Sequence, residues 1–473
     1  MRSRLISALL PVTLILSNAL NMLGIVVLPK IINAEEFALF SLASSIGLFI
    51  ISILFEWSRI CVMRYSVTTS DEETARRKAT LNAANMWAAM LLVVVAGFSQ
   101  FLQTTYAAVF GMACLFAVSQ ALFEARQASF RAEFKDAAYI RNIVVRAVLG
   151  FVSLCAFAFF TQSAIFAMCG WAASYGLVLL LTRNPLRQPP AGEFDRATLS
   201  FLLKFGLGVT MAAVATAALS PLLRLVAAQL IPLDQSGKMM LAMDISQKIV
   251  GVLGVSINLI TLQATFRAKE FGDDNATSRR VSAQLSIVVA VVVPAVVGFA
   301  ALSHSFTNLF IPTAYRDVYS QNIQWCMLAA GLIGIRAFAL DSVFLVAGRS
   351  YLGITGPVAT VLSSLLALLA LGSLRGYSTV VISQAMVAGA LVGICVSILL
   401  GKRVLHFAIA WPDIGKVLVA SMLMYGMIAL VPHFGDASFL ATATGIGAIA
   451  YSLFMFGTNA LGLQQMFYRP PAA

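Results

Sequence analysis

Long apolar stretches alternate with short polar segments along almost the whole chain. A helix needs about 20 predominantly apolar residues to cross the hydrocarbon core of a bilayer. Stretches without a single charged residue cover 5–29, 37–55, 350–374 and 417–435, and each suits one crossing. The pattern therefore predicts a series of membrane-spanning helices.

Two charge-free stretches are too long for one crossing, and each contains a polar break. Residues 79–123 are interrupted from Gln100 to Thr105, and residues 147–182 are interrupted from Thr161 to Ser163. Fourteen helices are expected in all, over 5–30, 37–57, 80–100, 106–125, 141–160, 164–182, 199–230, 239–264, 282–302, 318–347, 350–372, 376–400, 416–432 and 438–461. The predicted fold class is all-α, a polytopic membrane protein with about 14 transmembrane helices.

The positive charges give this series an orientation. Cytoplasmic loops carry an excess of Lys and Arg. With the N-terminus inside, 24 of the 32 Lys and Arg residues fall in inner segments, four in outer connectors and four within predicted helices. One missed helix would destroy this asymmetry. The sequence therefore predicts a multi-pass protein of the bacterial inner membrane with both termini in the cytoplasm.

Composition then removes several classes of protein. Apolar residues make up 60% of the chain and charged residues 11%, whereas a soluble domain averages about 25% charged residues. The net charge of +12 reflects topology and suits anionic membrane lipids, so no nucleic-acid partner is expected. No connector is long enough for a domain, and no Gly-x-x-x-x-Gly-Lys phosphate-binding loop occurs. An enzyme is disfavoured, no cofactor is expected, and a transporter fits better.

Two segments of the chain are similar to each other. Residues 28–40 end the first predicted helix and open the second, and residues 227–239 do the same for the seventh and eighth. Each has an apolar helix end and a short turn. An acidic residue (Glu35 or Asp234) and then a small residue (Ala38 or Gly237) follow. A proline-rich segment, 183–198, separates the two halves.

These turns and the basic stretch 56–65 resemble the polysaccharide flippases of the multidrug/oligosaccharidyl-lipid/polysaccharide exporter superfamily, although Ala38 stands where that family favours glycine. The resemblance implies two six-helix lobes, 1–182 and 199–400, joined by a cytoplasmic linker at 183–198. Two additional helices and a tail would occupy 401–473. It further implies a central cavity and the flipping of lipid-linked sugars from the inner to the outer leaflet.

Five charged residues inside predicted helices are the candidate substrate-binding residues. A charge in a span costs at least about 2.5–3.5 kcal/mol on insertion scales and usually faces a cavity or a partner. Arg224, Lys248 and Arg336 would bind the pyrophosphate of a lipid-linked sugar. Asp244 lies four residues before Lys248, on the same helical face. Asp341 lies five residues after Arg336, a rotation of about 140° in an α-helix, so these two are expected on different faces.

Several of the charged residues also have a purely structural interpretation. Asp244–Lys248 could equally be a structural ion pair, whereas for Arg336 the cavity role is preferred to a structural pair with some carboxylate. Arg146 is expected to extend toward the membrane surface, Glu56 and Arg59 to form an interfacial pair, and Glu124 to lie near a helix end.

The favoured function is a flippase for lipid-linked (polyprenyl-pyrophosphate) oligosaccharide or polysaccharide repeat units that works by alternating access. Its partners would be this substrate, membrane lipids and polysaccharide polymerase or export proteins. Three alternatives remain: a cation-coupled multidrug exporter of the same superfamily, a peptidoglycan-precursor flippase, and a lipid-linked-sugar polymerase or ligase, which the short outer loops disfavour.

Overall fold

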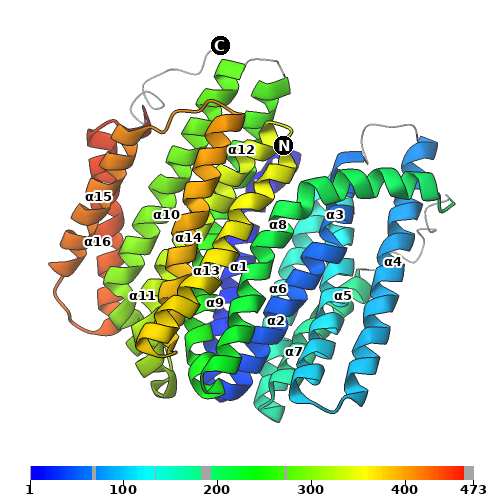
Figure 1. The fold of residues 1–473 in the computed structure, drawn as a ribbon, viewed down its shortest axis with the longest axis horizontal. Helices are drawn as coiled ribbons and strands as arrows, with labels where there is room; N and C mark the ends of the chain where they lie inside the picture. The colour runs from blue at the N-terminus through cyan, green and yellow to red at the C-terminus, as the bar shows by residue number, and fades with distance from the viewer. Residues whose placement is uncertain (1, 66–70, 134, 183–192, 271–273, 463–473) are drawn as a thin grey trace. The chain divides into compact units, whose positions relative to one another are not determined.

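The computed structural model describes residues 2–65, 71–133, 135–182, 193–270 and 274–462, and these residues form helices and connectors without a strand. Figure 1 shows the helices as coiled ribbons, coloured along the chain. The α-helices are α1 (Arg2–Val27), α2 (Ala34–Leu54), α3 (Glu56–Tyr65), α4 (Asp71–Phe101), α5 (Thr105–Ala132), α6 (Asp136–Thr161), α7 (Ala164–Leu181), α8 (Arg196–Leu230), α9 (Leu233–Glu270), α10 (Asp274–Phe310), α11 (Thr313–Ile335), α12 (Asp341–Val346), α13 (Thr355–Arg375), α14 (Thr379–Val404), α15 (Trp411–Ala429) and α16 (Asp436–Gly457). Short turns of other helical types are η1 (Leu28–Lys30), η2 (Arg336–Leu340), η3 (Ser350–Ile354) and η4 (Ala460–Gly462).

The predicted fold class is confirmed. Thirteen helical segments of the described chain are long and apolar enough to cross a membrane, and α1 adds an apolar stretch over Leu16–Lys30. Each of the fourteen predicted helices has a counterpart. The predicted helix at 37–57 is divided into α2 and α3, and the one at 318–347 contains α11, η2 and α12.

Helix ends follow local side-chain chemistry. The Asn33 side chain accepts a hydrogen bond from the backbone N–H of Glu36 at 2.8 Å and caps α2. Thr104 caps α5 in the same way through the N–H of Ala107 at 3.2 Å. Such caps satisfy N–H groups that have no partner inside the helix. The polar breaks of the sequence therefore become helix starts.

The chain forms two compact units, residues 1–237 and 238–473, and the boundary between them falls inside α9. In the first unit α2 packs against α5, α7 and α8, and α6 packs against α1 and α7. A buried cluster around Trp57, Cys61 and Leu202 attaches α3 to α8. The division into lobes at 183–198 stays a prediction, since residues 183–192 lie outside the described chain.

The first unit also brings the two similar turns together. A Cβ atom added to Gly237, at the start of α9, would lie 1.8 Å from the carbonyl oxygen of Ala34, at the start of α2. No side chain fits in that space. The small residue of the second turn is therefore required by direct contact with the first turn.

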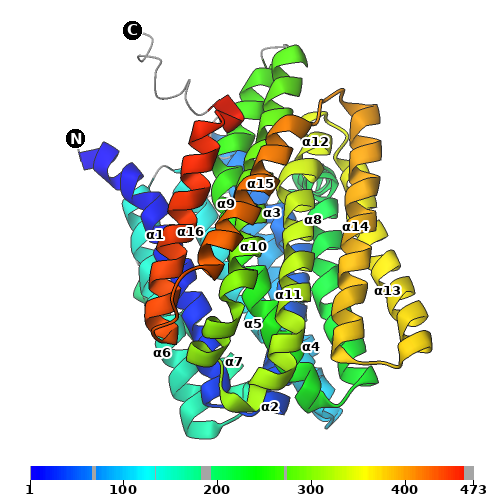
Figure 2. The same ribbon diagram turned by 90° about the vertical axis from the view of Figure 1, so that its left-hand side faces the viewer.

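In the second unit, small residues allow α13 and α14 to approach closely, and Figures 1 and 2 show the two helices side by side. A Cβ on Gly389 would lie 1.9 Å from Oγ of Ser364, and one on Gly393 would lie 1.9 Å from Oγ1 of Thr360. Small residues four apart are a common packing device between membrane helices. On another side of this unit α10 packs against α15 and α16 (Figure 2).

Candidate functional site

Arg224 lies in α8, three residues after Pro221, and is only 2% exposed. Its Nη1 atom donates to the backbone oxygen of Ser41 at 2.8 Å and to the hydroxyl of the same residue at 2.7 Å. Ser41 is part of α2 and is fully buried. The guanidinium thus joins α8 to α2 inside the first unit.

Arg336 and Asp341 form an ion pair in the second unit. Arg336 Nη1 lies 3.6 Å from Asp341 Oδ2, and the two side chains are 1% and 11% exposed. The expectation that they lie on different faces is wrong. Residues 336–340 are a π-helical turn, in which the N–H of Asp341 donates to the carbonyl of Arg336. This wider i→i+5 turn brings residues five apart onto the same side.

Neighbouring helices hold the π-helical turn in place. The side-chain amide of Gln284, from α10, donates to the backbone oxygen of Phe338 at 2.8 Å. Ser397, from α14, donates to Asp341 Oδ1 at 3.4 Å. A Cβ on Gly356 would touch Ser397 and Arg336, so this glycine makes room for the pair. π-turns inside α-helices are frequently found at functional sites.

Asp244 and Lys248 lie on α9 with both side chains partly buried. Each takes part in a non-covalent interaction within the protein. Their spacing of four residues on a continuous helix places them on one face. Four of the five predicted residues belong to the second unit, namely Asp244, Lys248, Arg336 and Asp341. Arg224 belongs to the first unit.

Sequence reasoning missed the role of Arg146. This residue is 8% exposed and does not extend to the surface as expected. Its Nη1 donates to the hydroxyl of Tyr175 at 2.9 Å and its Nη2 to Oδ1 of Asn21 at 3.0 Å. These partners come from α7 and α1. The only sequence signal for the site was the presence of polar groups in three apolar helices, because pairing across helices leaves no local pattern.

A chain of polar contacts continues from Tyr175 across the first unit. The Tyr175 hydroxyl donates to Gln120 at 3.3 Å, and Gln120 donates to Glu124 at 2.7 Å. Arg59 then bridges Glu124, at 3.6 Å, and Glu56. The interfacial pair expected from the sequence is thus one end of a network that connects α1, α3, α5, α6 and α7.

A small cavity adjoins the Glu56 end of this network. Its volume is about 10 Å³, room for about one water molecule, and its lining includes Glu56, Arg59, Glu124 and Asn85. Oδ1 of Asn85 has no hydrogen-bond partner among the described residues. Burial raises the pKa of Glu56 above its usual range, while nearby Arg59 opposes the shift. The described chain has no group of three or more His, Cys, Asp or Glu side chains able to hold a metal ion.

The fold and these buried side chains define a polytopic, all-α membrane protein with ionisable residues inside its spans. No family model matches the sequence, and no curated protein does so either. Solved structures do match. The lipid II flippase MurJ, in an inward closed conformation, has a TM-score of 0.73 and 14% identity, over 96% of this chain and 99% of that chain.

Two further similar structures belong to the MOP superfamily. An inward-facing multidrug resistance MATE family transporter has a TM-score of 0.59 and 12% identity over 86% of this chain and 96% of its own. A transporter from Pyrococcus furiosus, described as having a binding pocket of reverse polarity, has a TM-score of 0.54 and 13% identity over 86% and 95%. At these identities the likeness shows that the chain shares the fold of these proteins.

Proposed function

We propose that this protein is a flippase that translocates lipid-linked oligosaccharide or polysaccharide repeat units across the inner membrane by alternating access. The sign of the buried charge supports this function. Among the described residues, the fully buried charged side chains are all arginines, namely Arg146, Arg224 and Arg336. The guanidinium fork matches phosphate geometry, and a polyprenyl-pyrophosphate carrier is anionic.

In this mechanism Arg224, Lys248 and Arg336 bind the pyrophosphate, and Asp244 and Asp341 partly compensate the positive charge. Charges of this kind are retained inside spans because they meet a polar substrate or a partner. No nucleotide-binding loop occurs in the sequence, so an ion gradient or the membrane potential would supply the energy. We place both termini in the cytoplasm on the basis of the positive charges, and propose polysaccharide polymerase or export proteins as partners.

A peptidoglycan-precursor flippase is the second candidate. The similarity to a lipid II flippase over 96% of the chain favours it. Both candidates carry a sugar on a pyrophosphate-linked lipid, and the same arginines would serve either cargo. A multidrug exporter for organic cations is disfavoured because buried arginines repel a cation.

The test is substitution of Arg224 and Arg336 by Ala, singly and together, with surface polysaccharide as the readout. A hydrogen bond to a charged group contributes about 1.5–3 kcal/mol, so each substitution should reduce export roughly 10- to 100-fold at equal protein level. Arg403→Ala, which removes an exposed arginine, is the matched control and should export normally. Full export by the double variant at normal protein level would refute the assigned roles.

The cargo is tested in proteoliposomes that contain the purified protein. Three fluorescent compounds are compared: a pyrophosphate-linked oligosaccharide, a pyrophosphate-linked peptidoglycan precursor, and an organic cation. Movement of the first alone supports the favoured function, and movement of the second alone supports the second candidate. Transport of the cation without either lipid would contradict both.

A further inference from the structure

The small cavity beside Glu56 has two acidic side chains and one basic side chain in its lining. Glu56 and Arg59 come from α3, and Glu124 comes from α5. Arg59 forms an ion pair with Glu56 and lies 3.6 Å from Glu124 Oε2 through its Nη1 atom. With both carboxylates ionised, the three groups together carry one negative charge. Glu56 and Glu124 are only 18% and 28% exposed, and burial disfavours such a charge.

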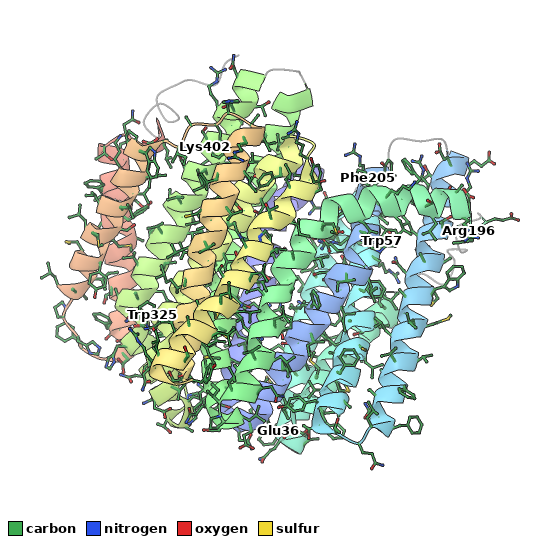
Figure 3. All side chains as sticks on the ribbon, in the orientation of Figure 1. Glu36, Trp57, Arg196, Phe205, Trp325 and Lys402 are labelled. Atoms are coloured by element: carbon green, nitrogen blue, oxygen red, sulfur yellow. The ribbon has the colours of Figure 1, made fainter. Side chains whose placement is uncertain are left out.

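Neighbouring helices do not compensate this charge. Among the described residues, the charged groups that act on Glu56 are Arg59 and Glu124. Tyr139, from α6, acts on Arg59 but is a neutral phenol at ordinary pH. On the side of α8, Trp57 belongs to an apolar cluster (Figure 3). The lining residues from α2 and the remaining ones from α5 are apolar, namely Ile51, Phe55, Ala121 and Ala125.

Two polar atoms of the lining residues have no hydrogen-bond partner within the described chain. One is Oδ1 of Asn85, a residue of α4 that is 5% exposed, and the other is Nε of Arg59. Leaving such buried groups unsatisfied is costly. The cavity, of about 10 Å³, has room for about one water molecule. Such a water can accept from Arg59, donate to Asn85 and donate to a carboxylate, and three hydrogen bonds are typical of a buried water.

A metal cation suits this cavity less well than a proton does. Hard metal cations take six or more oxygen ligands, and a space for one water does not hold such a shell. The guanidinium of Arg59, which is part of the lining, also repels a metal ion. A proton needs no shell, and the partial exposure of all three charged side chains allows it to reach them.

We propose that this cavity is a proton-binding site in which Glu56 takes up one proton through a bound water molecule. The water transfers a proton to the Glu56 carboxylate, where an O–H bond forms, and regains one from a hydronium ion of the solvent. The three charged groups then become neutral overall. Neutral Glu56 no longer competes for Arg59, so the guanidinium pairs with Glu124 alone and the proton strengthens the contact between α3 and α5. The site is separate from Arg224 and Arg336 and does not depend on the transported cargo.

The experiment is an infrared pH titration of the purified full chain, which follows the carbonyl stretch of protonated carboxylic acids. The unmodified protein should keep one acid band above the pH at which ordinary Glu side chains ionise, about 4.3. Glu56→Gln should remove this band. Glu133→Gln is the matched control, because Glu133 is 19% exposed but pairs with two lysines, Lys78 and Lys135; it should leave the band in place. Absence of the band from the unmodified protein, or its persistence in Glu56→Gln, would overturn the proposal.

A second variant tests the count of charges. Glu124→Gln leaves one carboxylate, that of Glu56, for one guanidinium, so the site is balanced without a proton. The midpoint of the acid band should therefore move to lower pH. An unchanged midpoint would contradict the role of the excess negative charge.

Two further measurements test the water and the identity of the cation. Asn85→Leu fills the cavity and displaces the water that donates to the ionised carboxylate, so the midpoint should rise by about 1–2 pH units. A midpoint equal to that of the unmodified protein, in a variant with a normal melting curve, would refute the bound water. Replacing choline chloride by sodium chloride at constant concentration should leave the band unchanged. Loss of the band in sodium would identify a metal-cation site and refute the proton assignment.

Discussion

The ion pair between Arg336 and Asp341 allows its structural and functional roles to be separated. With side chains only 1% and 11% exposed, Asp341→Asn leaves a buried guanidinium without its carboxylate. Breaking a buried pair in this way costs about 3–5 kcal/mol. In a unit of this size, 1 kcal/mol changes the melting temperature by about 2–4 °C. We therefore expect the melting temperature of the purified protein to fall by about 6–20 °C.

Replacing both partners has a different effect. Arg336→Met/Asp341→Leu removes the charges together and fills the same space with apolar groups, so stability should return to near the original value or rise above it. If Arg336 binds substrate, this double variant remains folded and fails to transport. If the pair is only structural, the double variant transports normally.

The half-exposed pair between Lys416 and Asp413 is the matched control. Its atoms are 3.8 Å apart and its side chains are 35% and 29% exposed. Such pairs contribute about 0–1 kcal/mol, so Asp413→Asn should change the melting temperature by about 4 °C at most. An Asp341→Asn variant as stable as this control would refute the reasoning about burial. Normal transport by Arg336→Met/Asp341→Leu would refute the binding role of Arg336.

Three other predictions concern packing, the polar network and pH. Gly237→Ala should destabilise the protein by about 1–3 kcal/mol, because the added Cβ would lie 1.8 Å from a backbone oxygen. Gly251 has open space around it, so Gly251→Ala should not destabilise the protein. The melting temperatures of the two variants test this difference. Tyr175→Phe removes the hydroxyl that accepts from Arg146 at 2.9 Å and should cost about 1–3 kcal/mol; an unchanged melting curve would contradict the network. Hydrogen bonds from the start of α8 lower the pKa of Asp195, so its stabilising effect is complete above the usual Asp pKa and is lost as the pH falls through the lowered value. In Asp195→Asn this acid-dependent loss should be absent from a pH series of melting curves.

Local sequence determined where the helices are. Runs of about 20 apolar residues predict spans because lipid leaves backbone groups no partner outside the helix, and this accounts for the agreement between the fourteen predicted helices and the structure. The polar break at 100–105 was correctly predicted to separate two helices, because polar residues interrupt an apolar span. The charge-free stretch ends at residue 55, before Glu56, but the break there between α2 and α3 was missed because the end of an apolar stretch does not show where the helix itself ends.

Contacts between helices could not be derived in this way. The sequence showed Arg146 and Asn21 as isolated polar residues, and their distance of 125 positions along the chain gave no sign of a bond. The same holds for Arg224 and Ser41, which are 183 positions apart. An apolar helix face packs equally well against many neighbours, so the pattern of hydrophobicity does not identify the partner.

The sequence by itself therefore determined the fold class of this protein, the approximate positions of its long apolar helices and the presence of charged residues inside them, since each depends on local transfer of residues from water to lipid. The tertiary structure decided how those charges are arranged. α-Helical geometry separates residues five apart, and only the π-turn at 336–340, held by Gln284 from another helix, brings Arg336 to Asp341. The π-turn depends on a contact with a neighbouring helix, and the residues of the turn itself do not reveal that contact.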